Sequence, residues 1–194
     1  MLTQVTKSKP IVAALLLDST DRAVLDTARY LAKKLHAPLE LVHAVRPLFS
    51  YVGSGDIAVN PYYGYELNYA DHEEKAARIK LERLVQSMDD VAVQAHVLRD
   101  FPAEAILTLA QEQGAGLIIC GVQNKEPRRL LSGLSTGFTL ASDAEIPVLL
   151  VPPQPIAFSS PLRILVADNL GSEGEHALNA AIYLANELHA EQLT

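Results

Sequence analysis

The sequence predicts an α/β protein with an open, five-stranded parallel sheet and helices on both faces. Short apolar runs alternate with segments of helical spacing, and proline or glycine stands at several of the boundaries. The 194 residues are 49% hydrophobic, which is enough to bury at least one sizeable core. The length corresponds to one domain and part of another.

The predicted strands are short runs that are apolar almost throughout. They cover residues 11–17, 39–45, 91–98, 117–120 and 148–151. A strand of an antiparallel sheet with one wet face would alternate between apolar and polar residues. Continuous apolar runs are typical of parallel strands that are buried on both faces, which is why we expect a parallel sheet.

Helices are predicted between these strands by apolar residues that recur at three- and four-residue spacing. They cover residues 21–35, 68–88, 102–113 and 135–144. Ser19 or Thr20 is expected to cap the first helix. Pro102 stands at a helix start, where its missing N–H costs little, and Gly114 follows the third helix as a stop signal.

An internal repeat indicates how the chain is divided. ARYLAKKLHA at 28–37 returns as AIYLANELHA at 181–190, and each copy follows an apolar strand that ends in aspartate, at Asp18 and Asp168. We therefore expect a complete domain at 1–153, a proline-rich linker at 154–161 and the strand and helix of a truncated second copy at 162–194. That last unit is too short to fold alone.

Charge and cysteine content limit the classes of partner. The net charge of −7 disfavours nucleic acid and anionic membranes, because both require a basic surface. A single cysteine, Cys120, excludes an internal disulfide, and no apolar run approaches the length of a membrane span. The histidines show no zinc-ligand spacing. We expect a soluble cytoplasmic protein without a metal site.

Ligands of an open parallel sheet bind beyond the carboxyl ends of its strands. Three predicted segments meet there: Asp18 after the first strand, His43 and Ala44 at the end of the second, and residues 121–135 after the fourth.

The order of these features resembles the universal stress protein family over residues 11–153. The segments that carry the resemblance are the strand ending at Asp18, His43, FPAEAIL at 101–107, GLIICG at 116–121 and IPVLLV at 146–151. Residues 162–194 resemble the start of the same domain. The resemblance implies a Rossmann-like sheet, similar to the adenine nucleotide alpha hydrolases, and an adenine nucleotide, ATP or AMP, as the candidate ligand.

Nucleotide-binding members of the family carry a glycine, two residues, a second glycine, nine residues, and then Gly-Ser or Gly-Thr. Aligned without a gap, these positions are Gly121, Asn124, Leu134 and Ser135, so only the first glycine and the serine are kept. Asn tolerates a left-handed backbone, whereas for Leu it costs about 1–2 kcal/mol. The resemblance thus implies a degenerate pocket. Its residues would be Asp18, Ala44, Gly121, Asn124, Leu134, Ser135 and Thr136.

Two further readings of the same region stay open. Asp18 either contacts the adenine or ribose of a ligand, as the resemblance implies, or caps the turn after the first strand. Lys125, Arg128 and Arg129 either bind a phosphate or another anion without the glycines, or form a solvated loop.

A competing motif indicates an enzyme. GLSTG at 133–137 has the form of the nucleophile elbow of serine hydrolases, with Ser135 as the nucleophile. The elbow requires a buried strand directly before the serine, and residues 126–132 contain only two apolar residues. His189 could follow as the base, but it lies in the repeated helix motif, which favours a structural role.

Two segments are candidates for contacts with other molecules. Residues 46–69 hold five of the seven tyrosines and form either a lid, a partner surface or a loop that packs over the sheet edge. The fifth strand should lie at the sheet edge, and in family members that strand pairs with a counterpart. We therefore expect self-association through Val148, Leu149, Leu150 and Val151.

The prediction for function is a non-enzymatic module of the stress response that senses or scaffolds. The first alternative is an ATP-binding switch with slow or no hydrolysis, and the second is a serine hydrolase.

Overall fold

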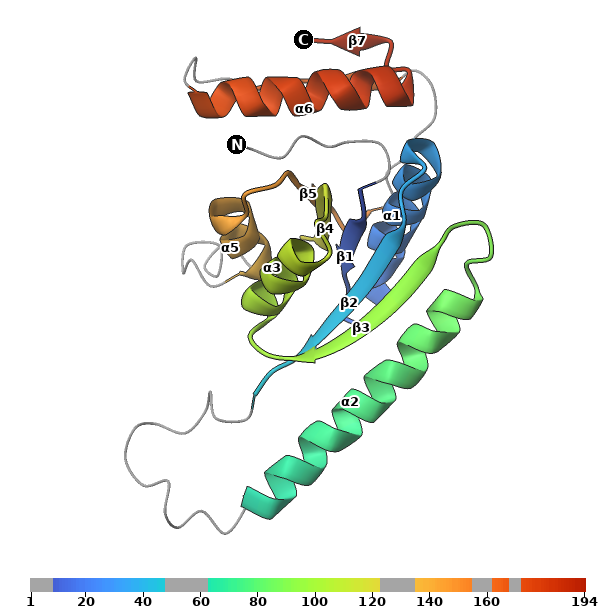
Figure 1. Cartoon of the computed structure of the whole chain (residues 1–194), viewed down its shortest axis with the longest axis vertical. Coiled ribbons are helices and arrows are strands. Elements are labelled where there is room, and N and C mark those ends of the chain that lie inside the picture. Colours follow the sequence, from blue (N-terminus) through green and yellow to red (C-terminus); the bar gives the residue numbers. More distant parts are fainter. Residues whose placement is uncertain (1–8, 48–62, 123–134, 155–161, 168–171) are drawn as a thin grey trace.

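The computed structural model describes residues 9–47, 63–122, 135–154, 162–167 and 172–194 (Figure 1). Its main body is a five-stranded sheet in the order β3-β2-β1-β4-β5, and every neighbouring pair is parallel. The strands are β1 (Ile11–Ala14), β2 (Leu39–Val45), β3 (Val93–Arg99), β4 (Leu117–Gly121) and β5 (Val148–Val151). The predicted parallel α/β fold is therefore confirmed.

Helices cover both faces of this sheet. On one face lie α1 (Arg22–Leu35), which follows a 3-10 turn at Ser19–Asp21, and α2 (Tyr63–Gln86). On the other face lie α3 (Pro102–Glu112) and α5 (Thr136–Asp143). Pro102 is at the start of α3, and Gly114 has a φ of 60° just beyond its end, as the sequence indicates. No helix in the described ranges is long and apolar enough to cross a membrane.

The three central strands, β1, β2 and β4, are mostly apolar because both of their faces are buried, whereas the edge strands β3 and β5 are partly exposed. Ile11 and Val12 point to opposite sides of β1, yet they are 1% and 0% exposed. The exception in β2 is Glu40, which is 3% exposed and accepts a hydrogen bond from Nε2 of His96 on β3 at 2.7 Å. This partner is what makes a buried carboxylate tolerable in the sheet.

The first strand is shorter than its apolar run. The N–H of Leu15 still donates to the carbonyl of Val42 at 2.9 Å, but Leu17 has a φ of 62°, which belongs to the left-handed region. A leucine in this conformation cannot continue a strand. Consequently β1 ends at Ala14 and the next residues form a turn, where the sequence predicts strand to residue 17.

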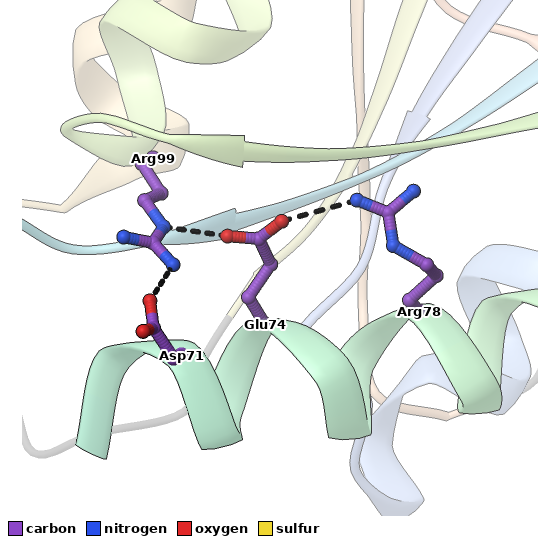
Figure 2. A network of polar contacts seen from close by, with 4 residues as sticks. All are labelled: Asp71, Glu74, Arg78 and Arg99. Carbon is purple, nitrogen blue, oxygen red and sulfur yellow. Dashed lines mark hydrogen bonds and ion pairs between the residues drawn. The ribbon is translucent and has the colours of Figure 1, made fainter. Parts of the chain in front are cut away.

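The long helix α2 is fastened to the end of β3 by a cluster of ion pairs (Figure 2). Arg99 is the last residue of β3, and its guanidinium donates to Asp71 and, at 2.5 Å, to Glu74. Glu74 also accepts from Arg78 at 3.0 Å. Its contacts with Arg99 and then Arg78 hold the pKa of the Glu74 carboxyl below its ordinary value. The cluster orients α2 more than it stabilises the fold, because it is exposed to solvent.

The C-terminal unit copies the opening of the main body. It contains β6 (Arg163–Ile164), α6 (Ser172–Leu188) and β7 (Gln192–Leu193), and the two strands pair in parallel. The repeated motif ends both helices in the same way. His36 and His189 have φ of 50° and 53°, and the next residue of each donates its N–H back to Ala32 or Ala185. The sequence predicts only a strand and a helix here, and the short strand β7 is an addition to it.

This unit rests on the main body near the C-terminal end of α1 (Figure 1). Tyr183, Leu184 and Leu188 of α6 pack against the core that α1 shares with the sheet. A cavity of about 520 Å³ lies between the two helix ends. Equivalent positions of the repeat line it: Lys33, Lys34 and His36 from α1, and Asn186, Glu187 and His189 from α6. Since α1 leads directly into β2, this cavity is at the amino edge of the sheet.

Candidate functional site

Three of the expected site residues lie along the carboxyl edge of the sheet. Ala14 pairs with Cys120, so Gly121 and the turn after β1, which contains Asp18, emerge side by side. Ala44 lies one residue before the end of β2 and pairs with Leu98. The sequence predicts these segments at one edge, and the parallel register brings them there.

The turn after β1 is fastened by a buried carboxylate. Asp21 is only 5% exposed, and it accepts the N–H of Leu16 on Oδ1 at 2.9 Å and the N–H of Leu17 on Oδ2 at 2.6 Å. Burial raises the pKa of the Asp21 carboxyl above its ordinary value, although the two amides oppose the shift. Each carboxylate oxygen thus accepts one backbone N–H of the turn. These N–H groups lie beyond the end of β1 and do not pair with a neighbouring strand.

Two side chains from neighbouring elements donate hydrogen bonds to carbonyls of the same turn. Nδ1 of His43, on β2, donates to the carbonyl of Leu15 at 2.9 Å. Nζ of Lys80, on α2, donates to the carbonyl of Leu17 at 3.2 Å. The turn is therefore fixed from β2, α2 and the start of α1 together, which is more support than an exposed loop usually has.

Asp18 makes a capping interaction, which is one of the two roles that the sequence suggests for it. Its Oδ1 accepts the N–H of Thr20 at 2.8 Å and the hydroxyl of Thr20 at 2.5 Å. Asp18 is the N-terminal cap of the 3-10 turn, and Asp21 is the N-cap residue of α1, so the prediction that Ser19 or Thr20 caps the first helix is wrong. The side chain lies at the exposed edge of the turn.

Gly121 packs closely against α1. A Cβ at this position would lie 3.1 Å from Cγ2 of Val24 on α1, which is tighter than ordinary van der Waals contact. Its neighbour Cys120 is buried, and burial raises the pKa of the thiol to about 11. A thiol with that pKa is not a nucleophile at neutral pH.

Ser135 opens α5, as the sequence predicts. Its Oγ accepts the N–H of Phe138 at 3.2 Å, and Thr136 is the first helical residue. Within the described ranges no hydrogen bond joins this hydroxyl to a histidine, and His189 is the cap of α6. Five expected residues lie outside the described part of the chain. They are Asn124, Leu134, Lys125, Arg128 and Arg129.

Asp21 and Lys80 belong to this edge but were not predicted from the sequence. One signal for Asp21 was present: it lies three residues before Val24, on the helix stripe that carries Ala28 and Leu31 into the core. A carboxylate on the buried stripe of a helix requires partners. No comparable signal marks Lys80, which looks like any lysine on the surface of a long helix.

Together, the two-sided parallel sheet and the turn after β1 at its carboxyl edge define a protein of the open α/β class, in which that edge is the usual place for a ligand. The profile of the "Universal stress protein family" matches residues 7–152. The Universal stress protein A homolog 2 of Coxiella burnetii is 31% identical over 151 aligned residues, and the match covers 74% of this chain and 94% of that protein. The chain belongs to the universal stress protein family.

Solved structures share the fold at low sequence identity. A universal stress protein from Archaeoglobus fulgidus superposes with a TM-score of 0.72 at 12% identity, covering 98% of this chain and 67% of its own. The universal stress protein UspA from Lactobacillus plantarum gives 0.57 at 16% identity, covering 76% and 98%. A functionally unknown protein from Pseudomonas aeruginosa gives 0.64 at 17% identity, covering 96% and 59%. Two of these chains are therefore longer than this one.

Proposed function

We propose that this protein is a non-enzymatic module of the stress response, which senses or scaffolds, with a degenerate adenine-nucleotide pocket at the carboxyl edge. One observation carries the proposal: Asp18 and Gly121 lie at adjacent strand ends, where a nucleotide would bind, but both serve the fold. Asp18 caps its own turn, and Gly121 makes room for Val24.

The phosphate half of the pocket is the weaker half. Ser135 still opens a helix, whose N-terminus favours an anion. The sequence, however, has Asn124 and Leu134 where the family motif has glycines, and a leucine side chain would crowd the phosphates. An adenine or ribose contact near Asp18 and Ala44 does not depend on those glycines. We therefore infer that any nucleotide is held mainly by its nucleoside, so that AMP binds about as well as ATP.

Calorimetric titration of the purified chain with AMP and with ATP tests this. The expected result is weak binding, with the two affinities within about threefold of each other. Leu134→Gly should then improve the affinity for ATP relative to AMP, whereas Leu131→Gly in the same segment should not. Tight binding of ATP alone, or ATP found on the protein after denaturation, would favour the alternative of an ATP-binding switch. The helix that Ser135 opens is the observation that supports this alternative.

We also propose that residues 162–194 open a second domain of the same kind, joined through a linker at 154–161. The repeated β–α–β order supports this, as do longer relatives that align with 98% and 96% of this chain. The β5 edge is the proposed surface for self-association. A cytoplasmic location fits the single, buried thiol of Cys120.

A variant that ends at residue 153 tests the domain boundary. It should keep the five-stranded sheet, because every strand of that sheet lies within residues 11–151. Its amide spectrum should change along the face of α1 that contacts Tyr183 and Leu188 and remain the same along α3. Loss of the whole fold would show that the division is wrong.

A further inference from the structure

The turn that carries Asp18 contains a conformation that its own residues do not favour. Leu17 has a φ of 62°, and a left-handed backbone costs a residue with a Cβ about 1–2 kcal/mol. The N–H groups of Leu16 and Leu17 both point to the carboxylate of Asp21, which is 5% exposed. The side chain that holds this turn therefore belongs to the last residue of the 3-10 turn, directly before α1, and is shielded from water.

We propose that Asp21 is the positioning residue of the site: its ionised carboxylate fixes the Leu16 and Leu17 amides and thereby places Asp18 for a nucleoside. The ligand part of this proposal rests on the proposed function, whereas the part that concerns the turn does not. Asp21 itself does not touch the ligand.

The two hydrogen bonds require the ionised form. A carboxylate accepts on both oxygens, and here each oxygen accepts one amide. Protonation converts one oxygen to a hydroxyl, which is a weaker acceptor and whose proton competes with the amide N–H for the same space. One amide would then lose its charged acceptor, and the turn would be held less firmly. Leu17 would lose the hydrogen bond that compensates the cost of its left-handed backbone. Because Asp18 is the next residue, its position would change with that of Leu17.

Several charged or titratable groups surround this carboxylate. Asp18 is on the same turn, Cys120 is on β4, His43 is on β2 and Lys80 is on α2. Burial, and to a lesser degree Asp18, raises the pKa of Asp21, so its protonation begins at a higher pH than that of an ordinary aspartate. Lys80 and His43 hold the carbonyls of Leu17 and Leu15 and do not depend on Asp21. Protonation of Asp21 would therefore release only the Leu16 and Leu17 amides.

The turn can be tested without a ligand, by following the amide resonances of the whole chain between pH 7 and pH 3. We expect the Leu16 and Leu17 amides to titrate together, with one midpoint above 3.8, because they share one carboxylate. Asp21→Asn should abolish this titration. Asp26→Asn is the matched control: it removes an exposed carboxylate from α1 and should leave the titration unchanged.

The ligand part is tested by calorimetry with AMP at pH 7. An asparagine can accept only one of the two amides and turns its NH₂ toward the other. We therefore expect Asp21→Asn to bind AMP about tenfold more weakly than wild type, which corresponds to the loss of one charged hydrogen bond. Asp26→Asn should bind within about twofold of wild type.

The outcomes separate the two parts. Separate midpoints for the two amides, or a titration that survives Asp21→Asn, would overturn the role of Asp21 in the turn, and the wild-type arm decides this even if the variant does not fold. A shared titration with equal AMP binding by the two variants would overturn the ligand part alone. Absence of AMP binding by wild type would overturn the proposed function and the ligand part with it, and leave the turn to the amide data.

Discussion

Three residues other than glycine have left-handed backbones in the described part of the chain, and each terminates an element. Leu17 ends the approach from β1, while His36 and His189 end α1 and α6. At the two helix ends the following amide bonds back to the carbonyl five residues earlier, a closure that normally uses glycine, as Gly114 does after α3. The histidines are thus retained at a conformational cost, and both line the cavity between the repeats.

The first residue-scale prediction follows from this cost. His36→Gly should stabilise the fold by about 0.5–1 kcal/mol, because glycine adopts the left-handed conformation freely but is more flexible in the unfolded chain. Urea denaturation measures the change. Lys34→Gly, two residues earlier in the regular helix, should destabilise by a similar amount. A loss of stability in His36→Gly would mean that the imidazole makes a contact worth more than the backbone cost.

The second residue-scale prediction concerns Gly121. Gly121→Ala places a methyl group 3.1 Å from Cγ2 of Val24, a stiff, buried side chain, and should destabilise by about 1 kcal/mol. In a Val24→Ala background the same change should cost less, by at least about 0.5 kcal/mol in a double-mutant cycle. Equal costs in both backgrounds would show that the glycine is needed for its backbone and not for the approach of α1.

At the scale of elements, the contacts that orient α1 and α2 are ionic, while the contacts that stabilise them are apolar. Asp90, in the turn between α2 and β3, receives Nε of Arg29 and Nζ of Lys33 at 2.8 Å each. Both cations belong to α1, so this turn ties α1 to the α2–β3 connection. Lys33 and then Arg29 lower the pKa of Asp90 to about 2, from an ordinary 3.8.

The contacts of Asp90 with Arg29 and Lys33 predict that part of the free energy of unfolding depends on pH in the acid range. A carboxyl whose pKa is lowered by folding stabilises the fold above its ordinary pKa, and the contribution disappears as the pH falls from 3.8 through about 2. Asp90→Asn should therefore unfold with a weaker pH dependence than wild type in this range, and high salt should reduce the difference. Asp89→Asn, at the exposed neighbouring position, should follow wild type. Parallel curves for Asp90→Asn and wild type would contradict the pairing.

The elements that the sequence predicts well are those that apolar pattern alone determines. The strands β2, β4 and β5 and the helices α3 and α5 lie within one or two residues of their expected bounds, because a buried parallel strand and an amphipathic helix have distinct periods. β1 is overestimated, since Leu15 to Leu17 are apolar although Asp21 withdraws two of their amides from the sheet. The strand β7 covers only Gln192–Leu193, too short for any period.

The sequence predicts where the candidate site lies, but not what each of its side chains does there. Parallel topology fixes which strand ends meet, so Asp18, Ala44 and Gly121 could be assigned to one edge. What each side chain does there depends on tertiary contacts that no spacing encodes: the approach of Val24 to Gly121, or the reach of Lys80 from α2 to the carbonyl of Leu17. Nothing in the sequence around Lys80 distinguishes it from its neighbours on the helix.

At the scale of the whole molecule, different elements lie at the carboxyl edge and at the amino edge of the sheet. The carboxyl edge gathers the turn after β1, the end of β4 and the start of α5. The amino edge receives α6 on α1, where equivalent residues of the repeat face each other across the cavity. The proposed ligand and the C-terminal unit therefore do not compete for the same surface. The edge of β5 that faces away from β4 is a third surface, separate from both.

The edge of β5 yields the last prediction. β5 pairs only with β4 in the described part of the chain, and Leu150 is 38% exposed on it. Unpaired apolar edges associate, and a lysine on such an edge blocks association. Sedimentation at micromolar concentration should give a dimer for wild type and a monomer for Leu150→Lys. Leu178→Lys should remain a dimer, because Leu178 is 37% exposed but lies on α6. A monomeric wild type would show that the β5 edge does not associate. A dimer that survives Leu150→Lys but is lost in Leu178→Lys would place the interface on α6 and not on β5.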